Sequence, residues 1–127
     1  WDIVDVSAPW MGVYLTEVED PMPLLIKLSK SKSLWQRRVS IILTFGLIRA
    51  GDLEPTIFIS ESLLKDKEDL IHKAVGWMLR ELGKKDVMLL RGFLKQHSHQ
   101  MPRTMLRYAI ERLPEPERKR WLVESKS

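Results

Sequence analysis

Four residues of one predicted helix combine cationic and aromatic side chains at helical spacing. Lys73, Trp77, Arg80 and Lys84 are separated by four, three and four positions, so they share one face over three turns. Phosphates attract cations, and sugars or bases pack on a flat apolar ring, so this stripe favours a nucleic-acid partner. The alternative is a solvated basic stripe with a core tryptophan.

A second group of residues could act on a developing positive charge. Trp1 and Asp5 are four residues apart, so on a helix they would lie one turn apart on the same face. Arg38 has apolar neighbours at helical spacing, which include Trp35 and Ile41, so its guanidinium needs an anionic partner or a path to solvent. Asp5 is the candidate partner, and a structural ion pair between repeats is the alternative.

The elements that would position these residues are all helices. Prolines and glycines divide the chain into segments of helical length, with hardly a strand signal. The predicted helices cover residues 1–18, 21–29, 33–50, 53–65, 68–83, 86–97, 101–113 and 115–124. The buried stripe expected for 68–83 consists of Leu70, Ala74, Val75, Met78 and Leu82.

Similar four-residue segments recur at a nearly constant interval. Segments beginning at Asp5, Arg38, Lys73 and Arg107 follow one another at 33, 35 and 34 residues, and each has a charged residue followed by small and apolar ones. This spacing indicates an all-α protein, a helical-repeat α-solenoid of antiparallel helix pairs in which one helix per repeat offers a polar residue to a shared face. Chance similarity among amphipathic helices is the alternative.

Composition limits the classes of function. The 127 residues contain no cysteine, which excludes disulfides, thiolate zinc sites and cysteine nucleophiles. A hydrophobic content of 44% and a charged content of 30% are typical of a globular protein, and the apolar runs are too short to span a bilayer. The net charge of +4 is compatible with a polyanionic partner. We expect a single domain over residues 1–127, monomeric and cytoplasmic, associated with the nucleoid in a bacterium, and without a membrane partner.

Four segments together resemble the AlkD family of DNA alkylation repair enzymes. They are the runs 1–5 (WDIVD), 34–38 (LWQRR), 71–81 (IHKAVGWMLRE) and 102–111 (PRTMLRYAIE), which occur in the order and approximate spacing of that family. The resemblance implies that the helical repeats are HEAT-like. It also implies a glycosylase that cleaves the N-glycosidic bond of cationic alkylated purines such as 3-methyladenine and 7-methylguanine in double-stranded DNA. It places the catalytic aspartate at Asp5, the two sugar-contacting tryptophans at Trp1 and Trp77, and the active-site arginine at Arg38 or the adjacent Arg37.

These residues suit that chemistry. An N-alkylated purine already carries positive charge and leaves readily, so the deoxyribose becomes oxocarbenium-like. A carboxylate can stabilise this cation and orient water, and indole faces can hold the sugar. The resemblance also implies that the lesion's backbone is held against the protein while the base is not enclosed.

Cations placed to contact DNA phosphates complete the predicted site. They are Arg37, Lys73, Arg80, Lys84, Arg103 and Arg107. We expect no cofactor and no metal, because His97 and His99 lack a third ligand at fitting spacing.

The family's fold continues upstream of the Trp-Asp motif, so we expect this chain to be a fragment that lacks upstream repeats. A helical-repeat scaffold that binds DNA or protein without catalysis is the alternative function, and an inactive relative specialised for unusual DNA structures is another. They differ from the enzyme in whether Trp1, Asp5, Arg38 and Trp77 converge on one surface.

Overall fold

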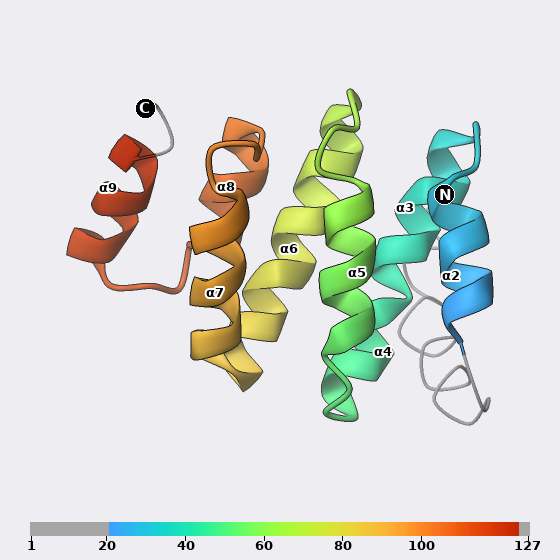
Figure 1. The fold of residues 1–127 in the computed structure, drawn as a ribbon, viewed down its shortest axis with the longest axis horizontal. Helices are drawn as coiled ribbons and strands as arrows, with labels where there is room; N and C mark the ends of the chain where they lie inside the picture. The colour runs from blue at the N-terminus through green and yellow to red at the C-terminus, as the bar shows by residue number, and fades with distance from the viewer. Residues whose placement is uncertain (1–20, 125–127) are drawn as a thin grey trace.

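The computed structural model describes residues 21–124, and every regular element within that range is a helix (Figure 1). The helices are α2 (Met22–Ser29), α3 (Leu34–Ile42), α4 (Thr44–Arg49), α5 (Glu54–Ser62), α6 (Asp69–Lys85), α7 (Val87–His97), α8 (Arg103–Ala109) and α9 (Glu115–Glu124). The predicted all-α fold class is therefore confirmed. The helix expected over 1–18 lies outside the described residues.

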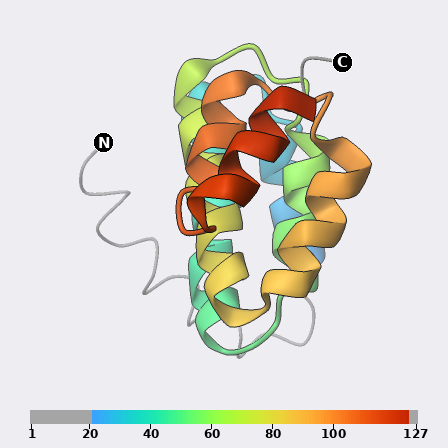
Figure 2. The same ribbon diagram turned by 90° about the vertical axis from the view of Figure 1, so that its left-hand side faces the viewer.

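The helices from α2 to α8 form two layers, and the chain alternates between them except from α3 to α4, as expected for a helical-repeat solenoid. One layer contains α2, α5 and α7, and the other contains α3 with α4, then α6 and α8 (Figures 1 and 2). Within the second layer α3 packs against α6 and α6 against α8, while α2 contacts both α3 and α5. The core lies between the layers and includes Ile41, Leu47, Ile59, Met78 and Leu94, all buried. The segments beginning at Arg38, Lys73 and Arg107 fall on α3, α6 and α8, so the repeat offsets correspond to neighbouring helices of one layer.

The helix predicted over 33–50 is divided in two. It begins as expected after Ser33, whose hydroxyl accepts a hydrogen bond from the Gln36 amide at 3.4 Å. It is interrupted at Leu43, where the Thr44 hydroxyl donates to the Ile41 carbonyl at 2.6 Å. A side-chain bond of this kind competes with the backbone ladder and bends helices, which accounts for the break.

A glycine in the left-handed region ends α4. Gly51 has φ +91°, its amide donates to the Ile48 carbonyl at 3.0 Å, and the Asp52 amide donates to Leu47 at 2.9 Å. These two bonds form a Schellman motif, which satisfies carbonyls that the helix end would leave free. The chain then reverses into α5 in the opposite layer, and Pro55 occupies the first turn of α5.

Helix α6 is the longest described helix and carries the predicted basic stripe. Its buried face consists of Ile71, Ala74, Val75, Gly76, Met78, Leu79 and Leu82. The expectation that Leu70 belongs to this face is wrong, because its side chain is exposed. Position 70 is adjacent to Ile71, about 100° around the helix, and Ile71 takes the core position instead.

Helix α8 is shorter than predicted, whereas α9 covers the predicted residues 115–124 and lies at the C-terminal end of the two layers. Helix α8 covers only part of the predicted 101–113, because Pro102 precedes its first turn and residues 110–113 form turns before Pro114.

Arg91 of α7 makes two hydrogen bonds of 3.0 Å to the Glu117 carboxylate of α9. The Trp121 indole donates to the same carboxylate at 3.1 Å. The hydrogen bonds from Arg91 lower the pKa of Glu117 and raise that of Arg91, so the pair remains ionised at neutral pH.

Among the described helices, none has the length and apolar character needed to cross a membrane.

Candidate functional site

A pocket of about 260 Å³ lies on the layer formed by α3, α6 and α8. Arg38, Lys73, Ala74, Trp77, Arg80 and Tyr108 line it. Three of these side chains are cations and two are aromatic, and no carboxylate lies among the lining residues. The pocket therefore offers positive charge beside flat rings, which is the combination that phosphates and sugars require.

Helix α6 supplies four of the six lining residues, because its helical period brings them to one side. Lys73, Trp77 and Arg80 project from successive turns on the side away from the buried face. Trp77 is half-buried, and its ring packs on Phe45 of α4 with centroids 6.0 Å apart and planes inclined at 56°. This contact orients the indole, and the rest of the ring remains available to a ligand.

Two adjacent arginines of α3 point to different places. The Arg38 side chain reaches across to α6, where one terminal nitrogen donates to the Leu70 carbonyl at 3.0 Å, and it lines the pocket. Arg37 turns away from the pocket. Its Nε pairs with Asp66 at 2.7 Å, and one terminal nitrogen donates to the carbonyls of Ser31 and Lys32 at 3.1 Å. The structure thus brings Arg38, and not Arg37, to the pocket.

The other two cations of the pocket each have a carboxylate partner. Lys73 lies 3.2 Å from Asp69, one turn earlier on α6, and both side chains are largely exposed. Arg80 donates to Glu111 at 2.9 Å, and Glu111 is also exposed. The Nε of Arg80 is buried without a hydrogen-bond partner among the described residues. Exposed pairs of this kind are weak, so an incoming phosphate can compete for both cations.

Tyr108 is a lining residue that the sequence reasoning missed. It lies on α8, where α6 and α8 approach closely at Gly76: a Cβ on this glycine would lie 2.5 Å from the Tyr108 Cβ and 2.6 Å from the Met105 carbonyl oxygen. The 35-residue interval from Arg38 to Lys73, applied once more, leads to Tyr108. The alignment of charged residues selected Arg107 instead. The residue at this interval is charged in the two preceding repeats, Arg38 and Lys73, but it is aromatic here.

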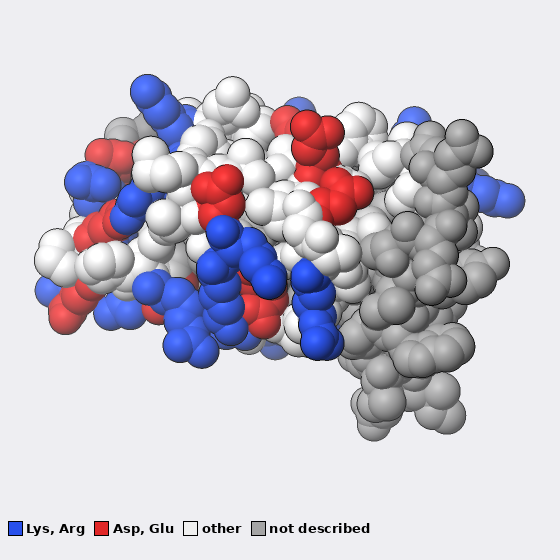
Figure 3. Space-filling model, turned by 90° about the horizontal axis from the view of Figure 1, so that it is seen from below, with Lys and Arg blue, Asp and Glu red and all other residues white. Residues whose placement is uncertain are grey.

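The remaining predicted DNA contacts lie outside this pocket. Arg107 is exposed on α8 but does not line it, and Arg103 donates to the Leu122 carbonyl of α9 at 2.8 Å. Lys84 pairs with Glu81 at 2.8 Å and lines two smaller hollows near the end of α6. The other cations that line these hollows are Arg49, Arg80, Lys85 and Arg112. Seen from this end of the molecule, Lys and Arg side chains gather on the side of α4, α6 and α8, with carboxylates among them (Figure 3).

Two predicted catalytic residues, Trp1 and Asp5, lie outside the described residues. The pairing of Asp5 with Arg38 and the contact of Trp1 with the sugar therefore remain predictions. The described residues contain no group of three side chains suited to hold a metal ion. His97 Nε2 lies 3.0 Å from a Glu61 carboxylate oxygen, and its ring packs on Phe93.

The sequence model of the DNA alkylation repair enzyme family matches residues 1–113 of the 127. The chain belongs to the DNA alkylation repair enzyme family. This membership confirms the resemblance read from the sequence and gives the chain a role in DNA alkylation repair. A comparison with curated proteins finds no match. In this family member, the matched range contains every residue of the cationic and aromatic pocket.

Proposed function

We propose that this protein is a DNA glycosylase that excises cationic N-alkylated purines, such as 3-methyladenine and 7-methylguanine, from double-stranded DNA. The observation that carries the proposal is the pocket in which Arg38, Lys73 and Arg80 surround Trp77 and Tyr108, on a chain of the DNA alkylation repair family.

The charge of the pocket favours the DNA backbone over the lesion base. Three cations around a pocket of about 260 Å³ would repel a positively charged purine and attract a phosphate. Arg38 and Arg80 have planar guanidinium groups that can bind phosphate oxygens in pairs. We therefore assign the pocket to a phosphate and sugar near the lesion, with the alkylated base left outside it.

The aromatic side chains would hold the deoxyribose. Trp77 and Tyr108 offer ring surface within the pocket, and Trp1 would supply the second indole against the sugar. An indole face also favours the positive charge that develops on the sugar.

Asp5 would act on that charge directly. As the bond between C1′ and the purine nitrogen breaks, its electron pair leaves with the purine, which becomes neutral, and positive charge moves to the sugar. The Asp5 carboxylate would stabilise this cation and orient a water molecule whose oxygen bonds to C1′ and whose proton is released. Arg38 would keep Asp5 ionised.

The decisive experiment replaces Asp5 with Asn. Asn keeps the size and hydrogen-bonding capacity but removes the charge, so release of 7-methylguanine under single-turnover conditions should fall by about 10²-fold or more while DNA binding persists. The control, Lys84→Ala, should lower DNA affinity modestly and leave cleavage at saturating protein nearly unchanged.

Cleavage at the native rate by folded Asp5→Asn protein would make Asp5 a structural partner of Arg38. The helical-repeat scaffold that binds DNA without catalysis would then be the better function.

A further inference from the structure

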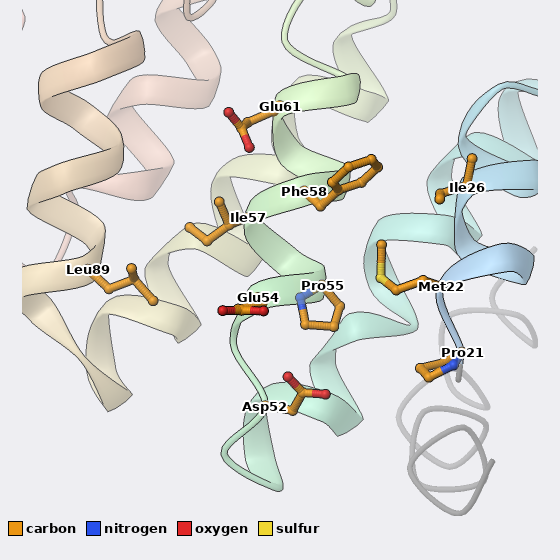
Figure 4. A pocket seen from close by; sticks show the side chains of 10 residues that line it. All are labelled: Pro21, Met22, Ile26, Asp52, Glu54, Pro55, Ile57, Phe58, Glu61 and Leu89. Atoms are coloured by element: carbon orange, nitrogen blue, oxygen red, sulfur yellow. The ribbon is translucent and has the colours of Figure 1, made fainter. Parts of the chain in front are cut away.

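Another hollow lies on the layer that does not carry the candidate site. It is an open groove of about 760 Å³ along α2, α5 and α7 (Figure 4). Ten residues line it: Pro21, Met22, Ile26, Asp52, Glu54, Pro55, Ile57, Phe58, Glu61 and Leu89. We call it the outer groove.

One face of α5 forms the centre of the outer groove. Glu54, Ile57, Phe58 and Glu61 are spaced at three, four and seven residues, which places them on one stripe over two turns. A stripe with this spacing is what a helix normally packs against another element. Here two apolar residues occupy the middle of the stripe, and a carboxylate stands at each end.

The apolar part of this stripe is open to solvent. Phe58 is 47% exposed, although moving a large aromatic side chain out of water lowers the free energy. Ile26 of α2 lies toward the Phe58 ring, and Leu89 of α7 lies toward Ile57 (Figure 4). The two neighbouring helices thus supply apolar walls on either side of α5.

The charge of the outer groove is opposite to that of the candidate site. Asp52, Glu54 and Glu61 are its charged lining residues, and none of the ten is Lys or Arg. Glu61 has a basic partner, since His97 Nε2 of α7 lies 3.0 Å from one of its carboxylate oxygens. A carboxylate-bearing groove on a chain of net charge +4 would not attract DNA, so a different partner must be sought for it.

We propose that the outer groove binds an amphipathic helix of a partner protein that carries Lys or Arg on either side of an apolar centre. The two carboxylates of the α5 stripe are seven residues apart, about 10 Å along the helix axis. A partner helix with the pattern cation, apolar, apolar, cation at positions 1, 4, 5 and 8 presents the complementary stripe. Because the groove and the candidate site occupy different layers, the partner could bind while the other layer holds DNA.

The test uses a labelled helical peptide that contains two Leu residues flanked by Lys at this spacing, and fluorescence anisotropy as the readout. A matched peptide with Glu in place of Lys has the same apolar surface and the opposite charge. We expect the Lys peptide to bind at least tenfold more tightly than the Glu peptide, with an affinity that weakens as salt increases.

Two pairs of protein variants locate the binding. Phe58→Ala should weaken the Lys peptide at least fivefold, and Glu54→Gln should weaken it about threefold and reduce its salt dependence. Val123→Ala and Glu115→Gln are the matched controls, because both residues are exposed on α9, away from the groove, and neither change should alter binding. Thermal unfolding verifies that each variant is folded.

The proposal fails if the Lys peptide does not bind, if both peptides bind equally, or if Phe58→Ala and Val123→Ala behave alike. Self-association of the protein that Phe58→Ala abolishes would also overturn it, since the occupant would then be a second copy of this chain.

Discussion

At the scale of single residues, two arginines that are adjacent in the sequence make different contacts. Arg37 and Arg38 are about 100° apart around α3, which directs one guanidinium to Asp66 and the other to the pocket. The side chains of Arg37 and Asp66 are 18% and 8% exposed, so their pair is shielded from solvent. The resemblance places the active-site arginine at Arg38 or Arg37, and of these two only Arg38 lines the pocket, so the proposed function uses Arg38.

Replacing each arginine with Gln should separate stability from binding. Arg37→Gln leaves Asp66 buried without its partner and should lower the free energy of unfolding by about 3 kcal/mol. Arg38→Gln should have a much smaller effect on unfolding but weaken binding to duplex DNA about tenfold. Urea unfolding and DNA anisotropy measure the two quantities, and the assignment is wrong if Arg37→Gln is the more damaging change for DNA affinity at equal folding.

At the scale of elements, the contact between α6 and α8 sets the shape of the pocket. Gly76 permits the two helices to approach so closely that Tyr108 can stand beside Trp77. The sequence alone could not reveal this, because a glycine inside a helical pattern reads as a weak position and not as a point of contact.

Gly76→Ala should therefore be destabilising although alanine is the better helix former. Its Cβ would meet the Met105 backbone at 2.6 Å, so α8 must move, and we expect a loss of about 3 kcal/mol and weaker DNA binding. Gly92→Ala on α7 is the matched control, because a Cβ there meets nothing within 4 Å, and it should stabilise the protein by about 0.5–1 kcal/mol. Equal effects in denaturant unfolding would contradict the close approach.

The docking of α9 should depend on pH through Glu117. The pKa of this carboxyl is lowered in the folded state, chiefly by Arg91, so its contribution to stability is present above the unfolded pKa of about 4.5 and is lost as pH falls through the folded value. Glu117→Gln should lower the Tm by a few degrees at pH 7, and the difference from the native protein should shrink below pH 4.5. Glu115→Gln, which removes an exposed carboxylate of the same helix, should have little effect at any pH. A penalty for Glu117→Gln that persists unchanged at pH 3 would show that ionisation is not its source.

At the scale of the whole molecule, two layers present hollows of opposite charge. The sequence predicted the helices, their pairing into repeats and the cations of α6, because hydrophobic periodicity and proline and glycine positions are local signals. It did not predict the partners of those cations, such as Glu111 for Arg80, nor the outer groove, because both depend on how separate helices pack. The exposed Leu70 shows the same limit, since adjacent apolar residues compete for one core position.

The cations of the candidate site should determine how DNA affinity depends on salt. Each phosphate contact releases counterions and adds about −0.9 to the slope of log affinity against log salt, so Arg38, Lys73 and Arg80 together should give a slope of about −3 or steeper. Lys73→Gln should make this slope less steep by about one, because its pair with Asp69 is exposed and yields to a phosphate.

Lys119→Gln is the matched control for this measurement. Lys119 lies on α9 in a similar exposed pair with Glu115, so its replacement removes the same net charge without removing a predicted phosphate contact. The slope should then remain as in the native protein. Equal changes for Lys73→Gln and Lys119→Gln would mean that net charge alone attracts DNA, because only a localised contact distinguishes the two lysines. A slope near zero in the native protein would exclude phosphate binding at this pocket, and its cations would then have to serve an acidic protein partner instead.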